Sequence, residues 1–275
     1  MESLDILPKL KETLDYIFVD LDDTLKPSNN IYPEDYHAVH LPRFAEIVRL
    51  ANSRVIPPIA LCTGRELPYV LGGIFPLMNA LSIIEGGVLT CNLARSTKQY
   101  HEKINAQVRQ YFQNLSTVIF PQILEHIPDL YLYTGKEINI AIQCRNPHAS
   151  IKDYEELLIR ELEKRLGGDI KELEYDLSSI AFDFRPKGVN KGSSFDQVCR
   201  VERIDPQRVL SIGDSPGDFP IMQKVGFLGT PLNADDLCKD LVTSKGRERG
   251  KIAHYQGLQG VIEILTCFAQ QECAG

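Results

Sequence analysis

An apolar run that ends abruptly in acids is the feature that most constrains how this chain can fold. The segment 16–21 is typical of a buried strand, and it carries Asp20 at its end, with Asp22 and Asp23 directly after. Alternate side chains of an extended segment share a face, so Asp20 and Asp22 are expected to lie side by side. Two such carboxylates repel each other unless a cation lies between them. The pattern suits a hard metal such as Mg²⁺, or a carboxylate nucleophile beside an acid/base, and an acidic turn is the structural alternative.

Composition excludes several classes of protein. The chain has 275 residues with 43% hydrophobic and 24% charged residues, as expected for a globular core plus an insertion. A net charge of −7 argues against nucleic acid as a partner. We expect no membrane span and no signal peptide, because no long apolar stretch exists and residues 1–11 are mixed and charged. Seven scattered cysteines without a Cys-x-x-Cys pair argue against zinc and favour reduced thiols in the cytoplasm.

Strand-like runs alternate with amphipathic helical patterns toward both ends of the chain. Such alternation, with nearly continuous apolar strands, predicts a Rossmann-like α/β core with a parallel sheet covered on both faces. Strands are predicted at 16–21, 59–62, 81–84 and 209–212, and helices at 41–51, 66–71, 189–201, from 219 onward and at 258–268.

The middle of the chain has a different, α+β pattern. A long helical pattern covers 104–127 with Pro121 as an expected break or kink, and a second helix is predicted at 151–166. Strands are predicted at 138–143, 171–175 and 179–184, the last two as a hairpin. We therefore expect an inserted α+β cap domain at 88–187, between the two halves of the core at 1–87 and 188–275.

Three further polar segments lie where predicted strands end or helices begin. Thr63-Gly64-Arg65 follows a strand and could hold an anion through its hydroxyl and backbone N–H groups, or simply cap a helix. Lys191 begins a helix and could neutralise a phosphoryl oxygen, or be an ordinary solvated lysine.

The last segment repeats the pattern of the first. Asp214 follows a buried strand, and Asp218 lies four residues on, where it could also be a helix N-cap. If the strands are parallel neighbours, Asp20, Asp22, Thr63 and Asp214 meet at the carboxyl edge of the sheet, where open α/β sheets bind ligands. Each of the four segments alone is weak evidence for function. Their occurrence together, in this order along the chain, indicates a phosphoryl-transfer site.

These segments resemble the four motifs of the haloacid dehalogenase-like (HAD) superfamily of phosphohydrolases. Asp20-Leu21-Asp22-Asp23-Thr24 is similar to its first motif, Asp-x-Asp-x-Thr. The second motif is matched by Thr63, the third by Lys191, and the fourth by the segment from Asp214 to Asp218. An α+β insert between the second and third motifs resembles the type IIB, Cof-like branch, which includes sucrose-phosphate and mannosyl-3-phosphoglycerate phosphatases. Three residues depart from the usual pattern: Asp23 for Gly, Gly217 for Asn, and Glu85 near an Asn-Gly.

The resemblance implies a role for each motif residue. Asp20 would be the nucleophile and Asp22 the acid/base, while Thr63, Gly64 and Lys191 would hold the phosphoryl group. The implied metal groups are Asp20, the backbone carbonyl of Asp22, Asp214 and Asp218, the last as a ligand or as a residue that orients Lys191. Arg65 and Arg185 are candidates for substrate contact.

The implied activity is Mg²⁺-dependent hydrolysis of a small phosphorylated metabolite, a sugar phosphate or a glycosyl-phosphoglycerate. It would proceed through an aspartyl-phosphate on Asp20. Two alternatives stay open: a phosphosugar mutase of the same superfamily, and a non-catalytic binding protein with the same fold. The choice of substrate and the oligomeric state have no sequence signal.

Overall fold

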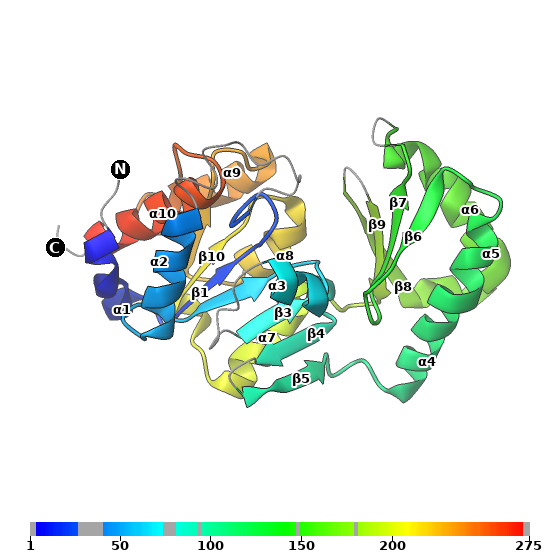
Figure 1. The fold of residues 1–275 in the computed structure, drawn as a ribbon, viewed down its shortest axis with the longest axis horizontal. Helices are drawn as coiled ribbons and strands as arrows, with labels where there is room; N and C mark the ends of the chain where they lie inside the picture. The colour runs from blue at the N-terminus through cyan, green and yellow to red at the C-terminus, as the bar shows by residue number, and fades with distance from the viewer. Residues whose placement is uncertain are drawn as a thin grey trace.

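Two sheets organise the chain (Figure 1). The computed structural model describes residues 4–26, 41–73, 81–92, 95–146, 149–178 and 181–271. The larger sheet has eight strands in the order β12-β11-β10-β1-β2-β3-β4-β5, and the smaller has four in the order β6-β7-β9-β8. This is the α/β class that the alternating pattern predicts.

Six strands of the larger sheet are parallel, and their order brings the two ends of the chain together. They are β1 (Tyr16–Val19), β2 (Ile59–Cys62), β3 (Leu81–Ile84), β10 (Val209–Ile212), β11 (Phe227–Thr230) and β12 (Gly250–Ile252). Strand β1 lies in the middle, between β2 and β10. Since the strand order reverses direction around β1, its carboxyl end is the place where such a sheet binds ligands.

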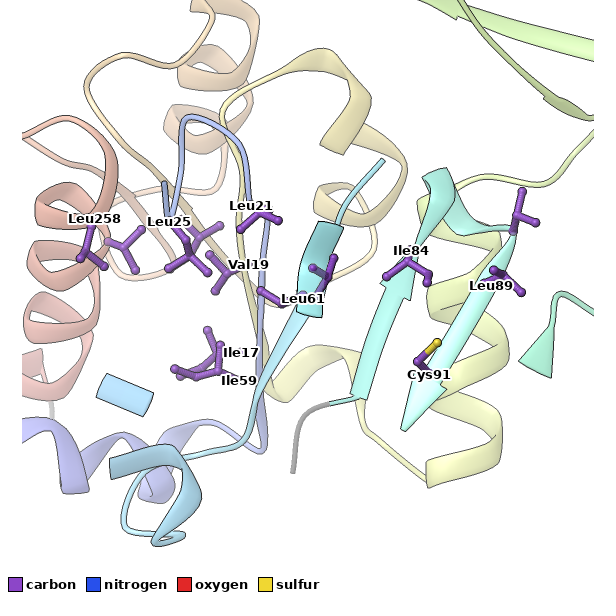
Figure 2. Close-up of a cluster of buried hydrophobic side chains, with 14 of the residues drawn as sticks. Ile17, Val19, Leu21, Leu25, Ile59, Leu61, Ile84, Leu89, Cys91 and Leu258 are labelled. Atoms are coloured by element: carbon purple, nitrogen blue, oxygen red, sulfur yellow. The ribbon is translucent and has the colours of Figure 1, made fainter. Parts of the chain in front are cut away.

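The strand β1 buries both of its faces because its side chains alternate. Ile17 and Val19 join one apolar cluster, shown in Figure 2, and Phe18 joins another on the opposite face. The first cluster is covered by α2 (Leu41–Asn52) and α10 (Gly257–Gln271), and the second by α7 (Lys191–Glu202), α8 (Phe219–Met222) and α9 (Asp236–Ser244). Buried parallel strands need helices on both faces, which explains their continuous apolar sequence.

The smaller sheet has helices on one face only. Its strands are β6 (Leu130–Tyr133), β7 (Ile140–Cys144), β8 (Leu173–Leu177) and β9 (Ala181–Pro186), and its helices are α4 (Ala106–Asn114), α5 (Phe120–Leu124) and α6 (Glu155–Leu166). Phe182 and Phe184 on β9 join the apolar cluster with these helices. Asp183 and Arg185 alternate with them and therefore lie on the other face, which is turned toward the larger sheet (Figure 1).

The long helical pattern predicted at 104–127 is helical from Ala106 to Leu124, with an irregular turn in its middle. A π-helical segment, Leu115–Ile119, joins α4 to α5 and ends two residues before Pro121. Proline has no N–H to donate and its ring clashes with the carbonyl four residues earlier, so the wider turn accommodates it without ending the helix.

The antiparallel strands β4 (Leu89–Asn92) and β5 (Thr97–Tyr100) extend the larger sheet beyond β3. The sequence analysis did not predict them, because β5 is polar and exposed and β4 is only four residues long, with two buried residues alternating with two half-buried ones. They fall inside the predicted cap at 88–187 but pair with the core. We therefore propose that the cap domain covers 101–187, and that residues 88–100 belong to the core.

Within the part of the chain that the structure describes, each helix is too short or too polar to cross a lipid bilayer.

Candidate active site

Three carboxylates from two chain segments, the one after β1 and the one after β10, converge at the carboxyl edge of the larger sheet. Asp20 follows β1 and Asp214 lies just beyond β10, and these strands are parallel neighbours. The backbone N–H of Asp20 donates to the carbonyl of Ile212 at 2.9 Å, which extends the hydrogen-bond ladder between β1 and β10 to Asp20. Carboxylate oxygens of Asp20, Asp214 and Asp218 all lie within 4.8 Å of one another. The convergence that the strand-end pattern predicts is therefore present.

Lys191 lies among these acids. Its Nζ donates to Asp20 Oδ1 at 2.8 Å and to Asp218 Oδ1 at 2.6 Å, and its side chain is 10% exposed. Asn190 caps α7 by accepting from the Ser193 N–H at 2.9 Å, so Lys191 is the first helical residue. The solvated-lysine alternative is thus excluded, because this ammonium group is buried between two carboxylates.

Two glycines allow this close packing. A Cβ on Gly192 would lie 2.0 Å from the carbonyl oxygen of Pro220, where α7 meets α8. A Cβ on Gly213 would lie 2.5 Å from the Asp218 carboxylate. Only glycine permits these backbone approaches, which bring Lys191 and Asp218 together.

The charges of the cluster are strongly coupled. Burial raises the pKa of Asp20 well above its usual range, although the Lys191 charge opposes that rise. Burial, together with the charge of Asp218, raises the pKa of Asp214 to about 7. Burial lowers the pKa of Lys191, but the charges of Asp20 and Asp218 outweigh it and raise the pKa well above its usual value. Three acids and one lysine leave an excess of negative charge in a site of low dielectric.

This donor set fits a divalent cation. Carboxylate oxygens are the ligands that Mg²⁺ prefers, and three of them lie within reach of a common point. A cation there would offset the repulsion that raises the pKa values of Asp20 and Asp214. Asp218 also accepts from the N–H groups of Asp214 and Ser215 through Oδ2, at 3.2 and 3.3 Å, so it can act as a ligand or as the residue that orients Lys191.

Asp22 does not join this carboxylate cluster. The extended geometry ends at Asp20, because the N–H groups of Leu25 and Lys26 both donate to the carbonyl of Leu21 and fold the chain into a tight turn. The Asp22 carboxylate is thus not part of the group of three acids, and the expectation that it shares a face with Asp20 stays a prediction. The Asp22 side chain is instead held by Arg65, with Arg65 Nε at 2.7 Å from Oδ2. The role of the Asp22 carbonyl as a metal ligand stays a prediction.

Thr24 is a motif residue to which the sequence assigns no role. Its hydroxyl donates to Asp214 Oδ1 at 3.1 Å and is fully buried. The contact ties the loop after β1 to the loop after β10. Asp214 is thereby oriented toward Asp20 from the opposite strand.

Thr63 and Gly64 follow β2, the neighbour of β1 on its other side. Thr63 is 1% exposed, and its hydroxyl oxygen accepts from the N–H of Arg65 at 3.1 Å. This bond closes a turn in the loop and does not cap a helix, because the next helix, α3 (Leu67–Gly73), begins four residues after Thr63. A phosphoryl contact of Thr63 and Gly64 stays a prediction, and their position one strand from Asp20 is consistent with it.

The candidate substrate residues Arg65 and Arg185 have carboxylate partners in this structure. Arg65 holds Asp22, and Arg185 Nη2 donates to Asp176 Oδ1 at 3.1 Å within the smaller sheet. Substrate contact by either arginine stays a prediction. Cys62, next to Thr63, is a buried core residue, and burial raises the pKa of its thiol, so it is not a reactive cysteine.

Glu85 joins the two sheets and was not identified as functional from the sequence. It follows β3 in a left-handed conformation with φ 52° and is 1% exposed. Its carboxylate accepts from the backbone N–H of Glu137 at 2.9 Å and of Ile138 at 3.2 Å, and its carbonyl accepts from Asn139 Nδ2 at 3.2 Å. Glu85 therefore fixes the turn between β6 and β7 to the core.

Replacing Glu85 with Gln should change how stability depends on pH. Burial raises the pKa of Glu85 to about 7, against an ordinary value of 4.5, although bonds from Ile138 and the charge of Lys136 oppose this. The folded state therefore holds the proton more tightly, and the wild type loses stability as the pH rises from about 4.5 to 7. Gln cannot ionise, so the stability of the variant relative to wild type should increase by about 2 kcal/mol between pH 5 and 8, at about 1.36 kcal/mol per pKa unit.

Urea unfolding of both proteins across this pH range measures the difference. Glu46→Gln, at an exposed position on α2, is the matched control and should show no such increase. A stability difference between Glu85→Gln and wild type that stays constant from pH 5 to 8 would show that Glu85 does not titrate there.

Comparisons with known proteins agree with this geometry. A family model described as haloacid dehalogenase-like hydrolase matches residues 140–244. A phosphoglycolate phosphatase of Methanobrevibacter smithii is 33% identical over 88 residues, which are 31% of this chain and only 38% of that protein. The chain thus matches well under half of the length of this relative.

Two solved structures share the fold over almost the whole chain. A haloacid dehalogenase-like hydrolase from Bacteroides thetaiotaomicron has a TM-score of 0.66 at 14% identity, and covers 92% of this chain and 98% of its own. The sucrose-phosphatase of Synechocystis, in complex with sucrose and phosphate, has a TM-score of 0.59 at 17% identity and covers 93% and 98%. These findings show that the chain has the fold of the haloacid dehalogenase-like hydrolases and that residues 140–244 are similar to the sequences of that family.

Proposed function

We propose that this protein is a Mg²⁺-dependent phosphomonoester hydrolase that acts on a small phosphorylated metabolite. The observation that carries the proposal is the buried group of Lys191 with Asp20 and Asp218, next to Asp214. Phosphoryl transfer depends on positioning and on neutralising charge, and this group supplies a nucleophile, a fixed cation and ligands for a metal. When bound, Mg²⁺ would supply electrostatic stabilisation of the phosphoryl oxygens.

In the first step, an Asp20 carboxylate oxygen attacks phosphorus and the bond from phosphorus to the ester oxygen breaks. The leaving oxygen takes a proton from Asp22, and an aspartyl-phosphate remains on Asp20. Lys191 and the backbone around Thr63 and Gly64 hold the transferring group. The cap domain covers the site and excludes water during this step.

In the second step, water attacks the phosphorus of the aspartyl-phosphate and gives a proton to Asp22. Inorganic phosphate leaves, and the Asp20 carboxylate is restored. Arg65 is then a positioning residue, because its guanidinium fixes the Asp22 carboxylate through two hydrogen bonds at 2.7 and 3.2 Å.

Asp22→Ala is expected to lower kcat by at least about 10²-fold, which is the usual contribution of a general acid–base group. The loss should be smaller for a substrate with a good leaving group, such as para-nitrophenyl phosphate, since that alcohol needs little protonation. Steady-state kinetics with both kinds of ester measure this. Equal rates for the variant and the wild type would remove Asp22 from the role.

The relatives support the reaction class and leave the substrate to experiment. The similar proteins named above include a phosphatase of phosphoglycolate and one of sucrose phosphate. A screen with para-nitrophenyl phosphate, sugar phosphates and glycerate derivatives, with and without Mg²⁺, tests the proposal. We expect release of inorganic phosphate only with the metal. Interconversion of sugar phosphates without release would indicate a mutase, and no turnover of any ester would indicate a binding protein.

A further inference from the structure

Glu66 is a buried carboxylate with one oxygen left without a partner. Its side chain lies between the two sheets, where Tyr133 of β6 donates to Glu66 Oε1 at 2.9 Å. A Cβ on Gly135 would lie 3.6 Å from Glu66 Cγ, so the turn after β6 packs directly against it. Glu66 is 5% exposed, and Oε2 has no hydrogen-bond partner among the described residues. A buried acceptor without a donor is costly, so a donor from outside the protein would stabilise this arrangement.

The residues around Glu66 contact the groups proposed for proton transfer. Glu66 directly follows Arg65, which holds the carboxylate of Asp22. The hydroxyl of Tyr133 also interacts with the Arg65 guanidinium. The hydroxyl of Tyr69 donates to Asp22 Oδ1 at 3.4 Å. Glu66 and Tyr133 therefore stand on the side of the site where the leaving alcohol departs.

Three of the nearby cations are already paired with acids, and a fourth, Lys26, lies over the ring of Tyr69 at 4.2 Å from its centroid. Arg65 pairs with Asp22, and Lys136 Nζ lies 2.6 Å from Asp183 Oδ1 on the face of the smaller sheet that is turned toward the core. Arg185 on the same face is paired with Asp176. A leaving group with its own carboxylate would be repelled by the charge of Glu66. A hydroxyl, in contrast, is the donor that a carboxylate oxygen accepts.

We propose that Glu66 Oε2 accepts a hydrogen bond from a hydroxyl of the leaving alcohol, and so selects phosphomonoesters of neutral, polyhydroxylated alcohols over those of carboxylated ones. The proposal rests on the phosphatase function proposed above. Tyr133 contributes by fixing the carboxylate from the cap as the cap closes. A substrate without the hydroxyl leaves Glu66 buried and unpaired, which is the strongest means by which a site rejects an analogue.

The test compares three classes of ester on the full-length protein with Mg²⁺. They are polyol monoesters (glucose 6-phosphate, fructose 6-phosphate and glycerol 3-phosphate), phosphoglycolate, and para-nitrophenyl phosphate. The wild type should have its highest kcat/KM among the natural esters on a polyol ester. Glu66→Ala should lower that kcat/KM by about 10²-fold, on the scale of a charge-assisted hydrogen bond.

Glu66→Gln should change the ratio of kcat/KM between the ester classes, which it would not do if Glu66 had a purely structural role. It removes the negative charge and keeps the shape, so phosphoglycolate should gain relative to the best polyol ester by about tenfold or more. Tyr133→Phe should lower the kcat/KM for that polyol ester relative to para-nitrophenyl phosphate. Tyr131→Phe is the matched control on the same strand, where the hydroxyl bonds to Gln143 instead, and should leave this ratio unchanged.

Three results would overturn the proposal. The first is a wild type that prefers phosphoglycolate to every polyol ester, and the second is one that hydrolyses para-nitrophenyl phosphate but no polyol ester. The third is a set of Glu66 variants in which all three classes change by the same factor. A wild type that hydrolyses none of the esters would instead refute the phosphatase function on which the proposal rests, so the two failures are distinguishable.

Discussion

Asp20→Asn is expected to reduce kcat by about 10⁴-fold or more, because an amide cannot replace the attacking carboxylate oxygen. The fold should be retained. Asn has nearly the same shape, and its Oδ1 can still accept from Lys191, which lies 2.8 Å from the Asp20 oxygen. Removing the charge of one of the three clustered acids also relieves repulsion between them, so the thermal midpoint should not fall.

Kinetics on para-nitrophenyl phosphate and on the best natural ester, together with thermal unfolding, measure both effects. Asp15→Asn is the matched control, since Asp15 pairs with Arg208 far from the sheet edge that carries the site. Wild-type turnover by Asp20→Asn would rule out Asp20 as the nucleophile. A variant that unfolds would leave kcat uninformative, and Asp20→Glu, which keeps the charge but misplaces the oxygen, would then provide the kinetic test.

Lys191→Met should be damaging to both activity and stability. It removes the cation that bonds to Asp20 and Asp218, so three carboxylates within 4.8 Å of one another lose their neutralising partner. Breaking a buried ion pair by removing one member costs about 3–5 kcal/mol, and uptake of a proton by one acid would bring the loss toward the lower figure. The lost stabilisation of the phosphoryl group should lower kcat by about 10²–10³-fold.

Chemical unfolding without divalent metal and steady-state kinetics with Mg²⁺ measure these two losses. Lys224→Met, which removes an exposed lysine paired with Asp196, should change neither by a comparable amount. If Lys191→Met retained both the stability and the turnover of the wild type, the ammonium group would have no role in charge neutralisation.

The buried parallel strands of the core could be predicted, because a strand that is buried on both faces has a continuous apolar sequence. The strands at 59–62, 81–84 and 209–212 have the bounds that their apolar runs indicate. The antiparallel strands β4 and β5 were missed because the sequence of β5, Thr-Lys-Gln-Tyr, is polar and lies at an exposed sheet edge. Edge strands bury little, so their sequences carry little pattern.

In the candidate site, contacts that follow from strand ends could be predicted from the sequence, and contacts between residues far apart in the chain could not. The carboxyl-edge rule correctly predicted that Asp20 and Asp214 meet, since it needs only strand ends and parallel pairing. It did not predict that Lys191, which begins a helix, donates to Asp20. The contact of Glu66 with Tyr133 joins residues 67 positions apart across two sheets, and no local pattern encodes it. Glu85 follows a strand end, so the rule that found Asp20 could have found it too.

Trapping the covalent intermediate tests the central claim most directly. The enzyme is mixed with its best ester and Mg²⁺, then treated with borohydride, which reduces an aspartyl-phosphate to homoserine, and its peptides are analysed by mass spectrometry. We predict homoserine at position 20, dependent on substrate and absent from Asp20→Asn. Rapid hydrolysis of the ester by a wild type that shows no modification at Asp20, or modification at another acid, would contradict the account.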